Sequence, residues 1–433
     1  MARLPLEGIR ILDFTLVWAG PYGTMFLADW GAEVIRVEST QYFQPSTRGG
    51  SASPVKEVVQ MMRGWGAGYP NYDPGDKPFN RYPIFQSHAR NKLSMTVDVT
   101  KPKGNEIFFR LLKMSDVYIE NNVPETIEKL GLTYDVVRRV KEDIIMVQMP
   151  AYGLSGPHKN YRSLGAHLDG TVGHTWLRGY PDMDPSMRGD IYLGDSAAGV
   201  AGAFAVAMAL RYRNKTGKGQ HIEMAQVENL MPYVGEALMD YGMNGRVQGS
   251  LGNRHPYMAP HGCYRCRGED RWVAISVTND EQWQGLCRAL GNPAWTQEKR
   301  FSDAASRWHN QDDMDDHIQE WTKERENYEV MRLLQAEGVA AGPVIDDRDA
   351  FSDPHFKERG FFQELTHPDC GTHLYPGLGW KASRTPNALR RHPVRLGEDN
   401  EYVYKTLLGV SDEEYAELER EGHIGTEYAP HVS

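Results

Sequence analysis

Short runs of β-forming residues alternate with helical patterns over the first 150 residues, and this alternation restricts the fold more than any other feature. Residues 9–14 read IRILDF and precede a Gly/Pro break, a helical pattern over 22–30 and a second β-rich run over 33–37. A strand–helix–strand order within about 30 residues is typical of a parallel sheet. The order then recurs, with further strands predicted over 93–97, 117–119, 144–149 and 221–224, and helices over 103–114, up to about residue 140 and over 197–210.

These elements predict an α/β fold whose large domain is doubly wound and Rossmann-like, and such sheets bind ligands outside the carboxyl ends of their strands. The alternation of strands and helices ends after residue 226. Gly-rich turns follow, then a predicted strand pair within 262–277 and three helical patterns over 281–290, 313–324 and 327–337. We therefore expect the first part of the large domain over 1–226, a smaller α+β domain over 227–343, and a C-terminal segment over 344–433 that returns to the large domain.

The charge of the chain argues against nucleic acid or an anionic membrane surface as the main partner, because the formal net charge is −10 and the pI is about 5.9. The apolar run 197–210 spans 14 residues, which predicts a buried helix and no membrane span. Residues 1–14 lack the pattern of a signal peptide. Four cysteines do not make a disulfide framework, so we expect a cytoplasmic protein.

Three local motifs resemble metal or cofactor sites, but an ordinary structural role is the favoured interpretation of each. Cys263 and Cys266 have CxxC spacing without a second pair of zinc ligands, so a strand is the favoured interpretation. The Gly-rich run 64–68 neither follows a strand nor opens a helix, which argues against a dinucleotide fingerprint. The acidic cluster 312–317 is typical of a helix start at the surface. We predict no metal site and no permanently bound cofactor.

Asp195 is the candidate for covalent chemistry. It stands directly ahead of the small, apolar residues of the run 197–210. One interpretation is an N-cap aspartate, which is the commoner role of an Asp at a helix start. The other is a nucleophile, because a helix N-terminus keeps a carboxylate ionised and small neighbours leave space for a bulky substrate. The residues alone leave both open.

A family resemblance covers nearly the whole chain and favours the second interpretation. The opening LPLEGIRILDFTLVWAGPYGTMFLADWGAEVIRVES resembles the N-terminal signature of class III CoA-transferases, the family of formyl-CoA and carnitine CoA-transferases (CaiB/BaiF). The other segments that resemble this family, in its order, are Asn91-Lys92, SDVYIENNVPETIEKLG (115–131), Gly194-Asp195, KTGKGQ (215–220), GNRHP (252–256), GVAAGPV (338–344), Asp353-Pro354 and LGE (396–398).

The resemblance implies transfer of CoA from an acyl-CoA donor to a carboxylic acid, with Asp195 forming first an acyl anhydride and then a CoA thioester. It implies coenzyme A and acyl-CoA as substrates, and an interlocked homodimer as the assembly. The positions that match the family's CoA-binding residues are Val17, Trp18, Ala19, Val97, Asp98, Val99, Thr100, Asn121, Asn122, Val123, Lys129 and Arg162. The substrate pocket and its mobile loop match Ser163, Leu164, Gly165, Tyr257, Met258 and Ala259.

Departures from the family pattern limit which reaction and which acceptor acid we expect. An α-methylacyl-CoA racemase is the alternative on the same fold, but its histidine base would fall at Leu164, and His167 is three residues later. Leu164-Gly165 replaces the Tyr and acidic residue of the transferases, and Trp18 replaces the Gln of the oxalate-specific relative. We therefore expect an acceptor larger and less polar than oxalate, with help from aromatic residues in 60–85 (Trp65, Tyr69, Tyr72, Phe79, Tyr82 and Phe85). A non-catalytic subunit of a heteromeric transferase is the second alternative.

Overall fold

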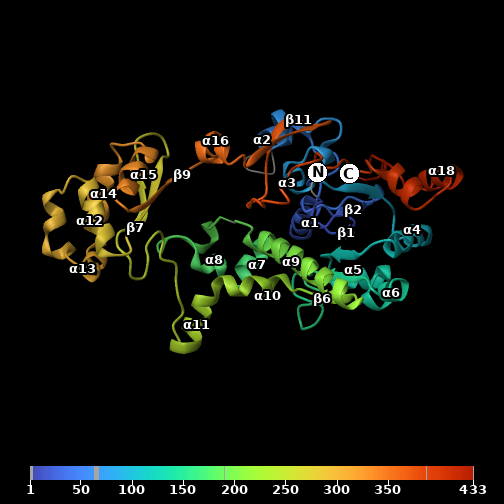
Figure 1. Ribbon diagram of the computed structural model, residues 1–433, viewed down its shortest axis with the longest axis horizontal. Coiled ribbons are helices and arrows are strands. Elements are labelled where there is room, and N and C mark those ends of the chain that lie inside the picture. Colours follow the sequence, from blue (N-terminus) through green and yellow to red (C-terminus); the bar gives the residue numbers. More distant parts are fainter. Residues whose placement is uncertain (1–2, 63–67, 190, 387, 433) are drawn as a thin grey trace. The chain divides into compact units, whose positions relative to one another are not determined.

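The computed structural model describes residues 3–62, 68–189, 191–386 and 388–432, and it divides into two compact units, each described here by itself. Unit 1 comprises Met1–Gly173, Asp190–Glu236 and Phe361–Ser433, so the chain returns to it at its C-terminal end. Unit 2 comprises His174–Gly189 and Ala237–Gly360 (Figure 1). The domain boundaries at 226 and 343 stay a prediction.

Unit 1 is built on a six-stranded sheet in which every neighbouring pair of strands is parallel. The strand order is β3-β2-β1-β4-β5-β6, so the direction of winding reverses between β1 and β4. The predicted α/β class, the parallel sheet and its six strands are thereby confirmed. The strands are β1 (Arg10–Phe14), β2 (Glu33–Glu38), β3 (Leu93–Thr96), β4 (Val117–Glu120), β5 (Ile145–Gln148) and β6 (Gln220–Glu223).

Each face of the sheet is covered by its own helices, because the strands are apolar on both faces. One face packs against α1 (Ala19–Asp29) and α9 (Leu193–Thr216). The other packs against α4 (Pro102–Lys113), α6 (Tyr134–Val140) and the C-terminal elements η8 (Tyr402–Leu407) and α18 (Asp412–Arg420). The prediction of one helix up to residue 140 is wrong, because Gly131 at φ 67° ends α5 (Pro124–Leu130) before α6 begins.

Helix α9 differs from the prediction in both its start and its length. It begins at Leu193 and Tyr192 is its N-cap residue, so Asp195 is the third helical residue and not the cap. Its 24 residues have a window of mean hydropathy 1.5, enough by length and composition to cross a membrane, although 56% of that window is buried within the protein. A single largely buried helix of this kind is also typical of a protein core.

Helices α1 and α9 cross at unusually close range, and two glycines make this possible. A Cβ atom on Gly23 would lie 2.7 Å from the carbonyl oxygen of Gly199. A Cβ atom on Gly199 would lie 2.8 Å from the carbonyl oxygen of Ala19. The crossing therefore needs glycine on both helices, and it brings the start of α1 next to the first turns of α9.

Unit 2 contains a three-stranded antiparallel sheet of β7 (His261–Arg265), β8 (Trp272–Ser276) and β9 (Ala340–Val344). The strand pair within 262–277 and the three predicted helices are confirmed. Of the two cysteines interpreted as a strand, Cys263 lies in β7 and Cys266 lies just after its end. Strand β9 was missed because its Gly342-Pro343 pair is typical of a turn; proline is tolerated there because β9 is an edge strand. The helices that cover this sheet are α12 (Asp280–Ala289), α13 (Ala304–His309), α14 (Gln311–Thr322) and α15 (Asn327–Ala336).

Shorter elements complete the two units. In unit 1 they include a C-terminal hairpin, β10 (Phe362–His367) and β11 (Gly371–Pro376). The remaining helices of the chain are α2 (Lys56–Met61), η2 (Pro70–Tyr72), η3 (Pro78–Asn80), α3 (Pro83–His88), α7 (Gly165–Thr171), α8 (His174–Leu177), η4 (Pro185–Met187), α10 (Gln226–Leu230), η5 (Met231–Val234), α11 (Gly235–Asn244), η6 (Ala294–Gln297), η7 (Lys299–Phe301), α16 (Asp347–Ser352) and α17 (Pro354–Glu358).

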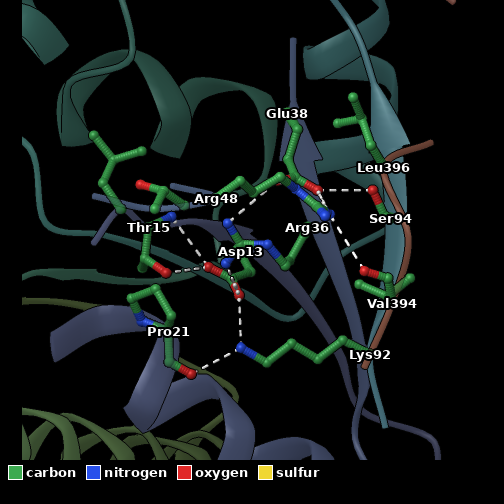
Figure 2. A network of polar contacts seen from close by, with 12 residues as sticks. Asp13, Thr15, Pro21, Arg36, Glu38, Arg48, Lys92, Ser94, Val394 and Leu396 are labelled. Atoms are coloured by element: carbon green, nitrogen blue, oxygen red, sulfur yellow. Dashed lines mark hydrogen bonds and ion pairs between the residues drawn. The ribbon is translucent and has the colours of Figure 1, made fainter. Parts of the chain in front are cut away.

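A buried cluster of charged side chains joins β1, β2 and β3 to the segment after β2 (Figure 2). Arg48 donates two hydrogen bonds to the Glu38 carboxylate, at 2.7 and 2.8 Å. Burial alone would raise the pKa of Glu38, but Arg48 and Arg36 lower it to about 2. The ionised form of Glu38 is therefore strongly stabilised by its two arginine neighbours.

The second half of the cluster fixes the start of α1. The Nζ of Lys92 donates to the carbonyl oxygen of Pro21 at 2.8 Å and to Thr24 at 2.7 Å, and lies 3.5 Å from the Asp13 carboxylate. Burial lowers the pKa of Lys92 to about 7, against the opposing effect of Asp13. Asp13 also accepts hydrogen bonds from Thr15 and Thr24, so one carboxylate ties the end of β1 to α1.

The Arg48→Met variant tests whether this buried cluster stabilises unit 1. Removing the guanidinium leaves Glu38 buried without its main partner, so we expect a loss of about 3 kcal/mol in the free energy of unfolding. Glu38 contributes its stability above pH 4.5 and loses it as the pH falls toward 2. In the variant Arg48 no longer lowers the pKa of Glu38, so less stability is lost over this pH range. Urea titrations at several pH values measure both effects.

The Lys77→Met variant is the control, because it breaks an exposed ion pair with Glu427 in the same unit. Equal destabilisation in the two variants would contradict the assignment.

Candidate functional site

The site lies where the winding of the sheet reverses, outside the carboxyl ends of β1 and β4. The two loops that leave these strands are joined by a reciprocal pair of hydrogen bonds. Leu16 N donates to Asn121 Oδ1 at 2.7 Å, and Asn121 Nδ2 donates to the Leu16 carbonyl at 3.0 Å. Asn122 Nδ2 also donates to the Phe14 carbonyl at 3.2 Å. The segment 121–123 is thereby fixed against the turn after β1.

Val17 in this turn adopts φ 60°, a conformation that is rare for a β-branched residue. Such a residue costs on the order of 1–3 kcal/mol, and its surroundings must hold it in place. The backbone N–H of Val17 donates to Thr47 Oγ1 at 2.9 Å, and Thr15 before it donates to Asp13. The strained turn therefore depends on the buried cluster and on the segment after β2.

A cavity of about 490 Å³ opens at this edge of the sheet. Nine of the residues predicted from the sequence line it: Val17, Asn121, Asn122, Val123, Arg162, Ser163, Leu164, Gly165 and Asp195. The sequence analysis missed six others: Leu16, Tyr42, Gln44, Thr126, Ala151 and Gln226. Most of these six lie within a few residues of a strand that ends at the site, which is the signal that could have found them.

Among the described residues that line the cavity, only Asp195 has a carboxylate, and its side chain is almost enclosed, with the residue 6% exposed. Burial raises the pKa of its carboxyl to about 6. Hydrogen bonds from the backbone of Ala19 and Gly165 oppose this rise, whereas the negative charge of Asp169 adds to it. The carboxylate is therefore ionised at neutral pH but poorly solvated, which is the condition of a reactive oxygen nucleophile.

Three helix starts converge on this carboxylate. Ala19 is the first residue of α1, Gly165 is the first residue of α7, and Asp195 is in the first turn of α9. The first N–H groups of a helix have no partner within it, and they carry the positive end of the helix dipole. Such groups bind anions, and they also stabilise negative charge that develops during a reaction.

Gly165 is required at its position because no side chain fits there. A Cβ atom on residue 165 would lie 1.8 Å from the Oδ2 atom of Asp195. Helix α7 begins with the Leu164 N–H donating to the Nδ1 atom of His167 at 3.0 Å. His167 is exposed, and its Nδ1 atom is engaged in this helix cap.

The other predicted CoA-binding residues are not among those that line the cavity. Trp18 is the N-cap residue of α1, and its ring lies 5.5 Å from that of Tyr192. Lys129 on α5 is exposed and pairs with Glu125 at 2.5 Å. Val97 and Val99 have their side chains in the core of unit 1, whereas Asp98 accepts hydrogen bonds from Thr100. The binding roles of these residues stay predictions.

Tyr257, Met258 and Ala259 belong to unit 2. Tyr257 is 70% exposed, Met258 contacts Ser276, and the Ala259 carbonyl accepts a hydrogen bond from the buried Arg307 at 3.3 Å. Only the first of these side chains projects into solvent. Their closure over Asp195 stays a prediction.

Those aromatic residues of 60–85 that the structure describes do not line the cavity. Phe79, Tyr82 and Phe85 are buried, and Phe79 packs on Tyr428 with ring centroids 5.1 Å apart. Tyr72 is 65% exposed, and Trp65 and most of the Gly-rich run 64–68 lie outside the described residues. Tyr42 and Gln44 reach the cavity instead, from the beginning of the long connection between β2 and β3.

Comparisons with known proteins agree with this geometry. The model of CoA-transferase family III matches residues 6–400. The chain is 30% identical over 417 residues to the succinyl-CoA–L-malate CoA-transferase beta subunit of Chloroflexus aurantiacus, covering 96% of this chain and 97% of that protein. It is 27% identical over 439 residues to the formyl-CoA:oxalate CoA-transferase of Rhodopseudomonas palustris, covering 97% of each.

A solved structure is similar over almost the whole length. The CaiB/BaiF family protein of Brucella suis superposes with a TM-score of 0.77 at 26% identity, covering 94% of this chain and all of that one. The family match, the relatives and the parallel sheet with its carboxylate at the switch point lead to one conclusion. The chain belongs to CoA-transferase family III and is an enzyme of that class.

Proposed function

We propose that Asp195 is the nucleophile that carries CoA from an acyl-CoA donor to a carboxylic acid. The observation that carries this proposal is the enclosed carboxylate at the convergence of three helix starts. Its pKa of about 6 leaves it ionised at neutral pH, and the cavity beside it gives a thioester access. A carboxylate is suited to this role because its anhydride and its thioester both retain the activation of the acyl group.

The reaction proceeds through four displacements at carbonyl carbons. A carboxylate oxygen of Asp195 attacks the donor thioester, the C–S bond breaks, and CoA leaves as the thiolate. The thiolate attacks the Asp195 carbonyl of the mixed anhydride, releasing the donor acid and forming an aspartyl-CoA thioester. The acceptor carboxylate then attacks this thioester, and the released thiolate attacks the acyl carbonyl of the second anhydride. Acceptor acyl-CoA leaves and the Asp195 carboxylate is regenerated.

The backbone N–H groups of Ala19 and Gly165 are suited to stabilise the oxyanions of these steps, because they already hydrogen-bond the carboxylate where charge develops. For CoA itself, Asn121, Asn122 and Val123 provide a polar loop along the cavity. Arg162 in the cavity wall and Lys129 on α5 provide cations for phosphate groups.

The apolar side chains of Leu16, Val17 and Leu164 in the cavity wall support an acceptor larger and less polar than oxalate. The relatives are named for L-malate, D-citramalate and oxalate, so the family accommodates acids of different size at this site. Relative kcat/KM values for a series of carboxylic acids test this part of the proposal, and a preference for oxalate would contradict it.

Replacement of Asp195 by Asn tests the nucleophile. The variant keeps the size of the side chain but cannot form the anhydride, so we expect kcat to fall by roughly 10⁴-fold or more while CoA still binds. Steady-state kinetics and calorimetric CoA binding measure the two effects. Turnover within tenfold of the wild type would contradict the assignment.

The pH dependence of kcat/KM tests the same residue independently. Only the ionised carboxylate attacks, so activity should fall as the pH falls through about 6. The charge of Asp169 raises the pKa of Asp195, so the Asp169→Asn variant should move this acid limb to lower pH. An acid limb at the same pH in both proteins would show that another group controls it.

Two glycines of α7 form a matched pair of tests. In Gly165→Ala the added methyl group occupies the space of the Asp195 carboxylate, so we expect activity to fall on the order of 100-fold while the fold persists. In Gly170→Ala the new Cβ meets no atom within 4 Å, so activity should be unchanged. Circular dichroism and kinetics compare them, and equal activities would contradict the geometry.

We further propose a cytoplasmic location and a homodimer with interlocked chains. One apolar face of α9 supports the presence of an interface. Val200, Phe204, Met208 and Tyr212 are spaced four residues apart, so they share a face, and all are at least 46% exposed. An exposed apolar patch of this kind is typical of a protein interface. Relatives named as alpha and beta subunits make a paralogous partner the alternative occupant.

The Phe204→Glu variant tests this interface. A charge in a buried apolar contact is costly, so the variant should have half the mass of the wild type in light scattering. Lys113→Glu on α4, at the opposite face of the sheet, is the control and should leave the mass unchanged. A monomeric wild type, or co-purification of a paralogous chain, would contradict the homodimer.

A further inference from the structure

Glu120 is a buried carboxylate that the proposed chemistry does not use. It is the last residue of β4, it is fully buried, and the segment 121–123 that lines the cavity begins directly after it. Its Oε2 atom accepts the backbone N–H of Asn122 at 2.6 Å and the side-chain amide of Asn122 at 3.2 Å. Its Oε1 atom accepts Nε2 of Gln148 at 2.7 Å.

All three partners of Glu120 are N–H donors, and this pattern favours the ionised form. A carboxylate accepts at both oxygens, whereas a protonated carboxyl carries an O–H group that would face a donor. Among the residues that the structure describes, no cation forms an ion pair with Glu120. Its charge is therefore balanced by hydrogen bonds alone, and chiefly by the two from Asn122.

None of the titratable groups described around Glu120 donates a hydrogen bond to it in place of Asn122 and Gln148. Tyr118 lies on the same strand and face, and its own pKa is raised by burial and by the charge of Glu120. On β6, His221 hydrogen-bonds the far side of the Gln148 amide at 2.8 Å, and Glu223 lies beyond it. From α6, Tyr134 stacks on His221 and Asp135 faces the same ring.

We propose that the ionised Glu120 carboxylate is a positioning residue for CoA binding, because it fixes both the backbone and the side chain of Asn122 in the cavity wall. The inference rests on the proposed CoA-binding role of the segment 121–123. Asn121 is already tied to Leu16, so Glu120 supplies the second anchor of this short loop. Without the charge, one of the two Glu120 oxygens carries a proton that faces an N–H donor and the other is a weaker acceptor, so the Asn122 contacts weaken and the loop loses its bound conformation.

The environment of Glu120 makes this anchor sensitive to pH. Burial raises the pKa of Glu120 to about 7, against the hydrogen bonds from Gln148 and Asn122. Glu120 therefore takes up a proton as the pH falls through about 7, and CoA affinity should fall with it. Protonation of Asp195 acts in the opposite direction, because it removes a negative charge from the cavity that receives an anionic ligand.

Calorimetric binding of dephospho-CoA between pH 6 and 8.5 tests the proposal. This ligand lacks the 3′-phosphate of CoA, whose own ionisation near pH 6 would obscure the effect. For the wild type we expect the Kd to rise on the order of tenfold from pH 8.5 to pH 6. For Glu120→Gln we expect the Kd to stay at every pH near the high value that the wild type has at pH 6. In steady-state kinetics, the KM of this variant for acyl-CoA should rise on the order of tenfold, whereas its kcat should change by less than about threefold.

Glu128→Gln is the matched control, because it removes an exposed carboxylate from α5, the helix that follows the same loop. It should keep the wild-type pH profile. A flat profile in the wild type, which needs no variant to fold, would overturn the inference, as would a Glu120→Gln protein with wild-type affinity. A wild type that binds neither CoA nor dephospho-CoA at any pH would instead overturn the proposed function, and the inference with it.

Discussion

The close crossing of α1 and α9 is the contact on which the candidate site depends. Gly23 and Gly199 allow the two backbones to approach so closely that the first N–H of α1 reaches the carboxylate of Asp195. Gly165 brings the start of α7 to the same carboxylate. The three helix starts raise the local positive potential where an oxyanion would form.

The strained turn before α1 and the buried charges beneath it belong to the same arrangement. Val17 at φ 60° is held by the hydrogen bond from its N–H to Thr47 in the segment after β2. Asp13 and Lys92 tie that turn and the start of α1 to the sheet (Figure 2). Glu120 plays the corresponding role on β4 for the segment 121–123. Buried acids at the ends of β1 and β4 therefore stabilise both loops at the switch point of the sheet.

Much of this could be predicted from the sequence, because local patterns determine the elements. The strands around Ile11 and Ile119 are continuous apolar runs bounded by turn residues, and all six strands of the sheet were predicted. Strand β9 was missed because Gly342-Pro343 has a turn signature that only its edge position overrides. The start of α9 was predicted too late, because Gly194 and Asp195 are poor helix formers whose position is set by packing.

The site was predicted less completely, because its lining depends on contacts between distant segments. Resemblance identified nine lining residues, but Tyr42 and Gln44 reach the cavity through the path of a long irregular segment that no periodic pattern describes. Conversely, the aromatic residues expected in an acyl pocket, such as Phe85, are mostly buried against neighbouring segments. The pKa shifts of Asp195 and Glu120 arise from burial, which sequence does not reveal.

The central claim is that Asp195 becomes covalently acylated, and trapping with hydroxylamine tests it most directly. The enzyme is incubated with acyl-CoA, treated with hydroxylamine and digested, and the modified peptide is located by mass spectrometry. An aspartyl hydroxamate at residue 195, absent from the Asp195→Ala protein, is the predicted result. A hydroxamate at another residue, or full activity in Asp195→Ala, would contradict the account.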